Sequence, residues 1–283
     1  MAAGFALSLG AVSACSPRRV AERILLRDHF TLTPGLAYGP AERQRLDVYR
    51  PRVVRSSAPV VVFVYGGRWQ NGSRDQYRLL GDALTRRGLV AVVPDYRLYP
   101  GVRFPAWVED AAQAVRWVSD SIGRFGGDPS HIFVVGHSAG AHTATLLGLD
   151  ERYLDRAGVP GGAVRGFVSI AGPVATVWTD PDVQALMGPR EGWTATYPLS
   201  HVDGTEPPIL LLHGERDRTV APANSVRLAE RIRQRGGCAR AIAYRGLDHV
   251  GIAIALSVPR LGGAPVLEDV LTFVGDPAGG CGG

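Results

Sequence analysis

The sequence predicts an α/β fold with a mostly parallel central sheet and helices on both faces. Several short runs consist almost wholly of apolar, β-branched residues, which is typical of strands buried on both faces of a parallel sheet. Segments with helical periodicity separate these runs, so strand and helix alternate along the chain. The chain has 283 residues, of which 46% are hydrophobic, and this is enough to bury the core of one such domain.

The expected strands differ in their hydrophobic patterns. Apolar and polar residues alternate over residues 44–49 up to Pro51, which predicts an early antiparallel strand. The other runs are nearly continuous and predict buried parallel strands. These runs are residues 59–65, 89–93, 132–135, 164–170, 208–213 and 239–244.

Helices are expected between these strands, where apolar residues recur every three or four positions. In the longest helix, a stripe that includes Val108, Ala112 and Val115 indicates a face buried against the sheet. The expected helices are residues 73–86, 107–124, 141–149, 222–235 and 266–274. Ligands bind such sheets at the carboxyl ends of the parallel strands, and functional residues are therefore expected there.

The charge pattern argues against a nucleic-acid partner. The formal net charge is +5, and all 31 basic residues are arginines. These arginines are scattered, whereas nucleic-acid binders concentrate them on one face or stripe. No C-x-x-C or H-E-x-x-H pattern suggests a metal site, and we expect neither a metal nor a cofactor. The pattern does not predict an oligomeric state.

The first 15 residues are similar to an export signal. The apolar stretch over residues 5–12 is too short to span a bilayer, and the small residues before Cys15 resemble a lipobox in which this cysteine is lipidated. No basic residue precedes the stretch, which departs from the usual signal. We expect an exported or membrane-anchored lipoprotein of the bacterial envelope, anchored only through Cys15. A frayed N-terminus of a cytoplasmic protein is the alternative.

One domain is expected over residues 35–275, between a linker at residues 16–34 and a flexible tail at residues 276–283. Residues 174–205 separate two strands and are rich in aromatic residues, so they form either a small cap or a surface helix whose aromatics join the core. Cys238 and Cys281 could pair in an oxidising compartment. Because Cys281 lies in the glycine-rich tail, we expect it to stay unpaired.

Residues 131–140, His-Ile-Phe-Val-Val-Gly-His-Ser-Ala-Gly, are the most informative segment. Residues 136–140 fit G-x-S-x-G between an expected strand and an expected helix, the context in which this pattern predicts a nucleophile on a sharp turn. A Cβ at either glycine would collide with the neighbouring strand or helix. Ser138 would stand at the helix N-terminus, which favours negative charge. A glycine-rich turn with a solvated serine is the alternative.

An acid and a histidine follow two later strands at the same edge of the predicted sheet. Asp217 and His249 lie in the loops directly after these strands. With Ser138 they predict a catalytic triad in the chain order serine, acid, histidine. Asp217 could instead cap a helix, and His249 could be a solvated loop residue. Asp248 is a rival acid, but neighbouring side chains rarely face each other across a site.

Two glycines directly follow the first of the expected buried strands. Such residues let backbone N–H groups turn toward a substrate carbonyl and form an oxyanion hole. The predicted donors are Gly67, Arg68 and Ala139, and Gly66 and Trp69 are expected to support the loop. An ordinary turn between strand and helix is the alternative. Further histidines near these segments are expected to pack or to support turns: His137, His142 and His213.

These segments together resemble the α/β-hydrolase superfamily. Within it, the chain is similar to the His-Gly-Gly-x-Trp type of carboxylesterase and formamidase, which is related to the hormone-sensitive-lipase-like carboxylesterases. The resemblance is carried by residues 61–69, 94–100, 125–129, 136–140 and 212–214. It extends over about residues 35–275 and implies the α/β-hydrolase fold. It also implies that residues 95–97 brace the oxyanion loop and take no part in the chemistry.

The chain departs from this family at Tyr65, where the family usually has a histidine that holds the oxyanion loop. The departure puts the hydrogen bonding of the loop in doubt and leaves the triad complete. Related prenylcysteine methylesterases also lack this histidine, so the resemblance does not require it for activity.

The residues and the resemblance together predict a serine hydrolase that cleaves carboxylic esters with small or medium acyl chains. Ser138 would attack the carbonyl, with His249 as base and Asp217 orienting the imidazole. The expected partner is therefore a small-molecule ester. An aryl formamidase that cleaves amides of the N-formylkynurenine type would use the same machinery and is the alternative reaction. A non-catalytic binding protein of the same fold is the alternative from another class.

Overall fold

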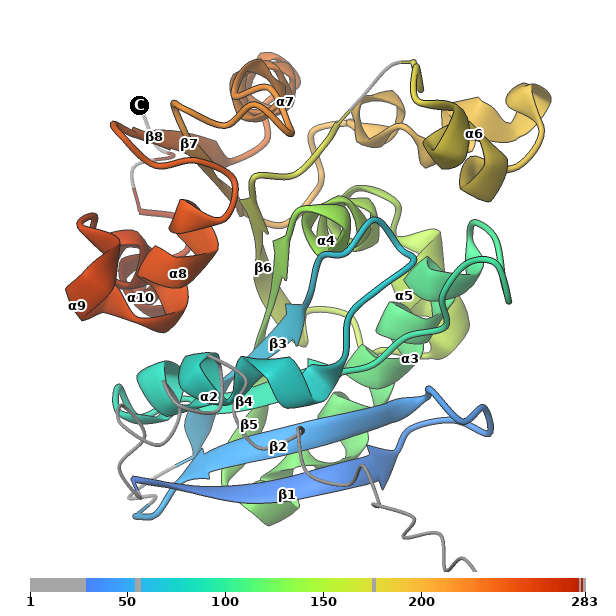
Figure 1. Cartoon of the computed structure of the whole chain (residues 1–283). Coiled ribbons are helices and arrows are strands. Elements are labelled where there is room, and N and C mark those ends of the chain that lie inside the picture. The colour runs from blue at the N-terminus through green and yellow to red at the C-terminus, as the bar shows by residue number, and fades with distance from the viewer. Residues whose placement is uncertain (1–28, 54–56, 175–176, 280, 282–283) are drawn as a thin grey trace, which may run out of the picture.

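The computed structural model describes residues 29–53, 57–174, 177–279 and 281, and it contains an eight-stranded sheet (Figure 1). The strands are β1 (Phe30–Ala37), β2 (Arg45–Pro51), β3 (Ala58–Val64), β4 (Val90–Pro94), β5 (Gly127–His137), β6 (Val164–Ile170), β7 (Ile209–Gly214) and β8 (Ala239–Tyr244). Their order is β1-β2-β4-β3-β5-β6-β7-β8. All neighbours from β4 to β8 run parallel, and β1 and β2 are antiparallel to their neighbours.

Helices cover both faces of this sheet, which confirms the predicted fold class. The α-helices are α2 (Arg78–Thr85), α3 (Ala106–Ser121), α4 (Ala139–Leu149), α5 (Arg152–Ala157), α6 (Pro181–Met187), α7 (Ala223–Gln234), α8 (Gly251–Ser257), α9 (Pro259–Gly262) and α10 (Val266–Gly275). The 3-10 helices are η1 (Arg74–Tyr77), η2 (Ile122–Phe125), η3 (Arg190–Thr196) and η4 (Pro198–His201). Helices α2, α8 and α10 pack together on one face, and α3, α4 and α5 pack together on the other (Figure 1).

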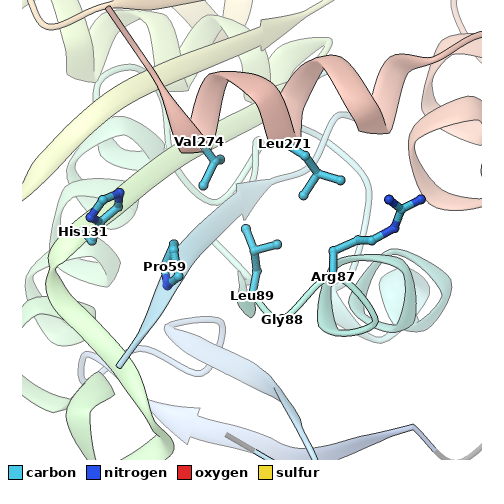
Figure 2. Close-up of a pocket in the computed structure, with 8 residues that line it drawn as sticks. Pro59, Arg87, Gly88, Leu89, His131, Leu271 and Val274 are labelled. Atoms are coloured by element: carbon cyan, nitrogen blue, oxygen red, sulfur yellow. The ribbon is translucent and has the colours of Figure 1, made fainter. Parts of the chain in front are cut away.

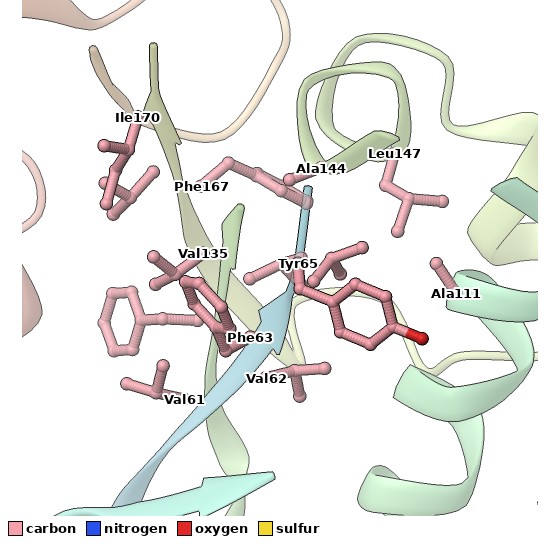
Figure 3. Packing of buried hydrophobic residues seen from close by; sticks show 14 of the residues in the cluster. Val61, Val62, Phe63, Tyr65, Ala111, Val135, Ala144, Leu147, Phe167 and Ile170 are labelled. Atoms are coloured by element: carbon pink, nitrogen blue, oxygen red, sulfur yellow. The ribbon is translucent and has the colours of Figure 1, made fainter. Parts of the chain in front are cut away.

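The core lies on both faces of the parallel strands. Successive side chains of β3 point to opposite faces, so that Val62 lies toward α3 and α4 whereas Val61 and Phe63 lie on the other side (Figure 3). All three side chains are at most 2% exposed. The continuous β-branched runs are therefore explained by burial on both faces, as the sequence predicts.

The first strand begins earlier than the domain boundary predicted from the sequence. β1 starts at Phe30, inside the linker predicted over residues 16–34, and the Phe30 ring lies 5.5 Å from the ring of Tyr49 in β2. A β-bulge interrupts the alternation of side chains in this strand, so the sequence pattern does not reveal it. At the bulge, Gly35 has a φ of 70° and donates its N–H to the carboxylate of Asp47. The rest of the predicted linker, residues 16–28, lies outside the described residues.

The C-terminal tail is tied to the sheet. Cys281 forms a disulfide with Cys238, the residue before β8, with the two Cα atoms 5.3 Å apart. The prediction that Cys281 stays unpaired in a free tail over residues 276–283 is therefore wrong for this cysteine. A turn after α10 explains the difference, because it brings the tail back toward the start of β8.

Some predicted features fall outside the part of the chain that the structure describes. The signal-like residues 1–15, with the lipidation candidate Cys15, are among them. Within the described ranges, no helix is both long enough and apolar enough to cross a membrane.

The sequence pattern does not predict α5 and α8, because helices of six and seven residues carry too few turns for a detectable period.

The segment predicted as a cap or a surface helix, residues 174–205, contains α6, η3 and η4. Its tryptophans are buried, with Trp178 6% and Trp193 8% exposed. The Trp178 ring lies 6.2 Å from Trp69, after β3, and 5.6 Å from His142, in α4. The segment therefore packs its aromatic residues into the core beside the loop that follows β3.

His142 should make the stability of the protein depend on pH. Burial lowers the pKa of His142 from 6.5 to about 4, so the unfolded chain binds this proton at a higher pH than the folded chain does. Above pH 6.5 the imidazole of His142 is neutral in both states and does not reduce the free energy of unfolding. As the pH falls from 6.5 toward about 4, the unfolded chain binds the proton and the free energy of unfolding decreases. The variant His142→Phe should therefore lose less stability than the wild type over this range, as measured by urea unfolding.

The matched control for this measurement is His131→Phe, which removes a half-buried histidine that contacts neither His142 nor its partner. It should keep the full dependence on pH. The same slope in His142→Phe as in the wild type would contradict the prediction. A lower stability of His142→Phe at neutral pH would not, because the Thr196 carbonyl oxygen loses its hydrogen-bond partner.

Candidate active site

Ser138 occupies a strained turn between β5 and α4. Its φ of 55° lies in the left-handed region, which a residue with a side chain rarely adopts. A Cβ on Gly136 would collide with the backbone of Gly140, and a Cβ on Gly140 would collide with the carbonyl oxygen of Val64 in β3. The two glycines therefore permit the turn that places Ser138 at the carboxyl edge of the sheet.

His249 connects Ser138 to Asp217. Its Nε2 lies 2.9 Å from Oγ of Ser138, and its Nδ1 lies 2.7 Å from Oδ2 of Asp217. His249 comes from the turn between β8 and α8, and Asp217 comes from the loop between β7 and α7. Because the carboxylate accepts the hydrogen of Nδ1, Nε2 is free to accept the proton of Ser138. The structure thus brings together the three residues predicted as a triad.

The carboxylate of Asp217 is buried, and both of its oxygens accept hydrogen bonds. Oδ1 accepts the backbone N–H groups of Thr219 and Val220 at 2.8 and 2.9 Å. Burial by itself raises the pKa of Asp217, but these bonds and the bond from His249 outweigh burial and lower the pKa below its usual value. The carboxylate therefore stays ionised. The rival acid Asp248 instead accepts a backbone N–H at the start of α8.

The loop after β3 lies directly against the turn that carries Ser138. A Cβ on Gly66 would stand 2.9 Å from Cβ of Ser138, so only glycine allows this approach. Gly67 and Arg68 have φ angles of 119° and 56°, and no hydrogen bond among the described residues uses their backbone N–H groups. Ala139 begins α4, where a helix leaves its N–H groups without intrahelical acceptors. The role of these donors as an oxyanion hole stays a prediction.

The side chains of this loop are held by neighbouring elements. Arg68 donates to the carboxylate of Asp180, just before α6, at 2.7 Å, and both side chains are partly exposed. Trp69 is 3% exposed, and its ring lies 5.7 Å from Trp107 in α3 and 5.1 Å from His142 in α4. The loop is therefore attached to α3, α4 and the segment that contains α6.

Tyr65, the point of departure from the family, is held by a polar network. Its hydroxyl donates to Oδ1 of Asp95 at 2.6 Å and accepts from Arg43 at 2.9 Å. Its backbone carbonyl accepts the hydroxyl of Tyr96 at 2.8 Å, and the two rings stack 4.8 Å apart. Burial raises the pKa of Tyr65 well above its usual value, so the hydroxyl stays protonated. The network fixes the backbone directly before Gly66.

Two of the three residues expected to brace the oxyanion loop contact Tyr65. These are Asp95 and Tyr96, through the bonds described above. The third, Arg97, instead forms an ion pair with the buried carboxylate of Asp110 in α3, at 2.7 Å. Arg97 therefore joins the end of β4 to α3 and has no direct contact with the loop among the contacts of the described residues.

Two further histidines lie next to the triad, namely His137, which the sequence predicts to pack, and His213, which it predicts to support a turn. Nε2 of His137 is 2.9 Å from the backbone carbonyl oxygen of His249, and the two rings lie 4.9 Å apart. Nε2 of His213 is 3.2 Å from Oδ2 of Asp217. The sequence does carry a signal for His213. This residue stands at the end of β7, the strand that precedes Asp217, and four residues before Asp217.

A hollow of 440 Å³, whose lining residues are drawn in Figure 2, contains none of the three triad residues. It is lined in part by Pro59 and Leu89, which lie at the amino ends of β3 and β4. The triad residues follow the carboxyl ends of the strands, so this hollow belongs to the opposite end of the sheet. In the described ranges, no group of three or more His, Cys, Asp or Glu side chains could hold a metal ion.

The chain is similar in sequence to proteins named as esterases. It is 28% identical to a protein of Oryza sativa subsp. japonica named probable isoprenylcysteine alpha-carbonyl methylesterase ICME, over 85% of this chain and 63% of that protein. It is 31% identical to esterase LipQ of Mycobacterium tuberculosis, over 88% of this chain and 63% of LipQ. The chain therefore spans less than two thirds of the length of both relatives.

Solved structures and a family model agree with this similarity. A truncated carbohydrate esterase from gut microbiota matches with a TM-score of 0.77 at 22% identity, over 89% of this chain and 98% of that chain. An esterase of the hyperthermophilic archaeon Pyrobaculum calidifontis matches with a TM-score of 0.75 at 24% identity, over 93% and 91%. These likenesses confirm the α/β-hydrolase fold. Because the BD-FAE family model matches residues 46–232, more than half of the chain, the chain belongs to the BD-FAE family of α/β hydrolases.

Proposed function

We propose that the chain is a serine esterase that hydrolyses carboxylic esters through an acyl-enzyme intermediate. The observation that carries the proposal is the hydrogen-bonded line from Ser138 through His249 to the buried carboxylate of Asp217. The relatives named methylesterase and esterase support an ester as the substrate. A nucleophile, a base and an orienting acid are the groups that acyl transfer to water requires.

In the first half of the reaction, Ser138 Oγ attacks the ester carbonyl carbon while Nε2 of His249 takes the hydroxyl proton. The N–H groups of Gly67, Arg68 and Ala139 donate hydrogen bonds to the carbonyl oxygen and stabilise the negative charge that develops on it. The C–O bond to the leaving group then breaks, and His249 gives its proton to the departing alcohol. The carboxylate of Asp217 stabilises the imidazolium in between.

In the second half, water takes the place of the serine hydroxyl. His249 accepts a proton from the water, whose oxygen attacks the acyl carbon. Collapse of the second tetrahedral intermediate breaks the bond to Ser138 Oγ, which recovers its proton from His249. The carboxylic acid leaves, and the enzyme returns to its starting state.

The proposed substrates have small or medium acyl chains. Trp69 is buried two residues after the glycines of the predicted oxyanion loop, and its ring lies 6.2 Å from the ring of Trp178. These two buried rings fill the space between the loop after β3 and the segment that contains α6. This crowding supports short esters over long-chain triglycerides.

A fluorophosphonate probe tests the proposed nucleophile. The wild type should give a single phosphonate adduct on Ser138 by mass spectrometry, because only an activated serine reacts rapidly with the probe. Ser138→Ala should not be labelled there and should lose ester hydrolysis by at least about 10⁴-fold. Ser130→Ala is the matched control, since Ser130 lies at an exposed part of β5 and should keep both labelling and rate.

The substrate class is tested on the same preparations. The ratio kcat/KM should be higher for p-nitrophenyl acetate and butyrate than for the palmitate ester, and higher for esters than for a formanilide. A preference for the formanilide would instead favour the aryl formamidase. An unlabelled, inactive wild type would favour the non-catalytic binding protein and would refute the proposal.

Removing the Tyr65 hydroxyl should weaken the attachment of the oxyanion loop. In Tyr65→Phe, Arg43 and Asp95 each lose a buried partner, and we expect the free energy of unfolding to fall by about 1–3 kcal/mol. We also expect a fall in kcat, because the loop before Gly66 is less firmly placed. Urea unfolding and steady-state kinetics measure the two effects.

The matched control is Tyr77→Phe. Tyr77 stacks on Tyr65 at 5.5 Å, but none of the hydrogen bonds found among the described residues uses its hydroxyl. This variant should keep kcat close to the wild-type value. If Tyr65→Phe and Tyr77→Phe have the same kcat, the hydroxyl network of Tyr65 does not position the loop.

We also propose that the protein works in an oxidising compartment, attached there through Cys15 if that cysteine is lipidated. The Cys238–Cys281 disulfide supports this location, because such bonds persist mainly outside the reducing cytosol. Protein isolated from its native cell without reductant should resist thiol alkylation at both cysteines. Reduction should lower the free energy of unfolding by about 2–4 kcal/mol. Freely alkylated cysteines in the native protein, or an unmodified Met1 by intact mass, would count against export.

A further inference from the structure

His213 contacts the same carboxylate oxygen that His249 contacts. It stands at the end of β7 with its side chain 2% exposed. Its Nε2 lies 3.2 Å from Oδ2 of Asp217 and 3.0 Å from the carbonyl oxygen of Val220, and its Nδ1 lies 2.7 Å from Oγ of Ser225. Both ring nitrogens are therefore engaged with the loop that carries the acid and with the helix after it.

These partners determine the protonation state of the ring. The carbonyl oxygen of Val220 can only accept, so Nε2 of His213 carries a hydrogen. The hydroxyl of Ser225 can donate, so Nδ1 accepts from it. Burial lowers the pKa of His213, which keeps the ring neutral. The neutral Nε2–H group thus donates to the carbonyl oxygen of Val220 and lies 3.2 Å from Oδ2 of Asp217.

We propose that His213 is a positioning residue that sets the basicity of His249 by donating a hydrogen bond to Oδ2 of Asp217, which both imidazoles share. The inference rests on the proposed ester hydrolysis. A second donor withdraws negative charge from Oδ2, so this oxygen attracts the proton of protonated His249 less strongly. His249 then remains deprotonated to lower pH and gives its proton to the leaving alcohol more readily.

The neutral state of His213 matters because His249 becomes cationic during the reaction. Two cationic rings would compete for one carboxylate, and repulsion from His249 is one cause of the lowered pKa of His213. Among the described residues, Asp217 interacts with the ring of His213, and His137 interacts with the rings of both His213 and His249. Burial lowers the pKa of His137 to about 4, so this third ring is neutral at neutral pH.

The hydrogen bonds to Oδ1 of Asp217 do not come from a side chain that could adjust the charge on the carboxylate. This oxygen accepts two backbone N–H groups, from Thr219 and Val220, which no substitution of a side chain removes. His213 is therefore the side chain through which the charge on Asp217 can be changed without touching the triad itself. It also ties Val220 to the end of β7, which holds the acid loop in place.

The pH dependence of kcat/KM tests this inference, because its acid limb reports the protonation of the base in the free enzyme. His213→Phe fills a similar space without a donor, and the midpoint of its acid limb should rise by about half a pH unit or more. We expect kcat per active site to fall about tenfold with little change in KM. Active sites are counted by phosphonate titration, which removes any effect of misfolded protein.

Two further variants distinguish positioning from a structural role. His213→Gln keeps an N–H donor near the position of Nε2 and should restore the midpoint toward the wild-type value. Ser225→Ala removes the hydroxyl that donates to Nδ1 of His213, which makes the Nε2–H group a weaker donor, so the midpoint of this variant should rise in the same direction by a smaller amount. Ser225→Ala also serves as the test if His213→Phe does not fold.

The matched control is His142→Phe, which removes a buried, neutral histidine that makes no bond to Asp217. Its midpoint should equal that of the wild type. An unchanged midpoint in His213→Phe, or an equal rise in His142→Phe, overturns the inference while ester hydrolysis by the wild type stands. A wild type without a phosphonate adduct on Ser138 overturns the proposed function and this inference together.

Discussion

The site depends on the close approach of two backbones, where the turn at Ser138 meets the end of β3. No side chain separates them, because Gly140 faces the carbonyl oxygens at the end of β3 and Gly66 faces Ser138 itself. This contact holds Ser138 at a φ of 55° and brings the loop that is predicted to carry the oxyanion donors beside it. A single methyl group at either glycine would push the two segments apart just beyond the point where β3 and β5 pair.

Charge in the site is concentrated on one buried carboxylate surrounded by neutral groups. Asp217 stays ionised because backbone N–H groups and His249 donate to it, and the neighbouring rings of His137 and His213 carry no charge. The single negative charge is therefore available to His249 when this ring takes the serine proton. A second cation in the same space would divide that attraction, and burial of both neighbouring histidines prevents this.

The residues that could be predicted from the sequence are those with a local signature. Ser138 lies in a strand–turn–helix pattern, and Asp217 and His249 follow recognisable buried strands, so their common edge follows from the fold class alone. The disulfide, the bonds of Tyr65 and the contact of His213 with Asp217 depend on which distant or flanking groups the packed chain brings close. The bulged first strand was also hidden, because Gly35 breaks its alternation where the chain needs a left-handed residue.

The position of β8 has a mechanical consequence for the site. This strand lies at one edge of the sheet and, among the described residues, pairs with β7 alone, so its ladder hydrogen bonds are supported from one side. His249 lies in the turn that follows the carboxyl end of β8. At the amino end of β8, the disulfide between Cys238 and Cys281 connects the strand to the C-terminal tail. Loss of the pairing between β7 and β8 would therefore move His249, the predicted base, away from Ser138 while the central strands of the sheet stay paired.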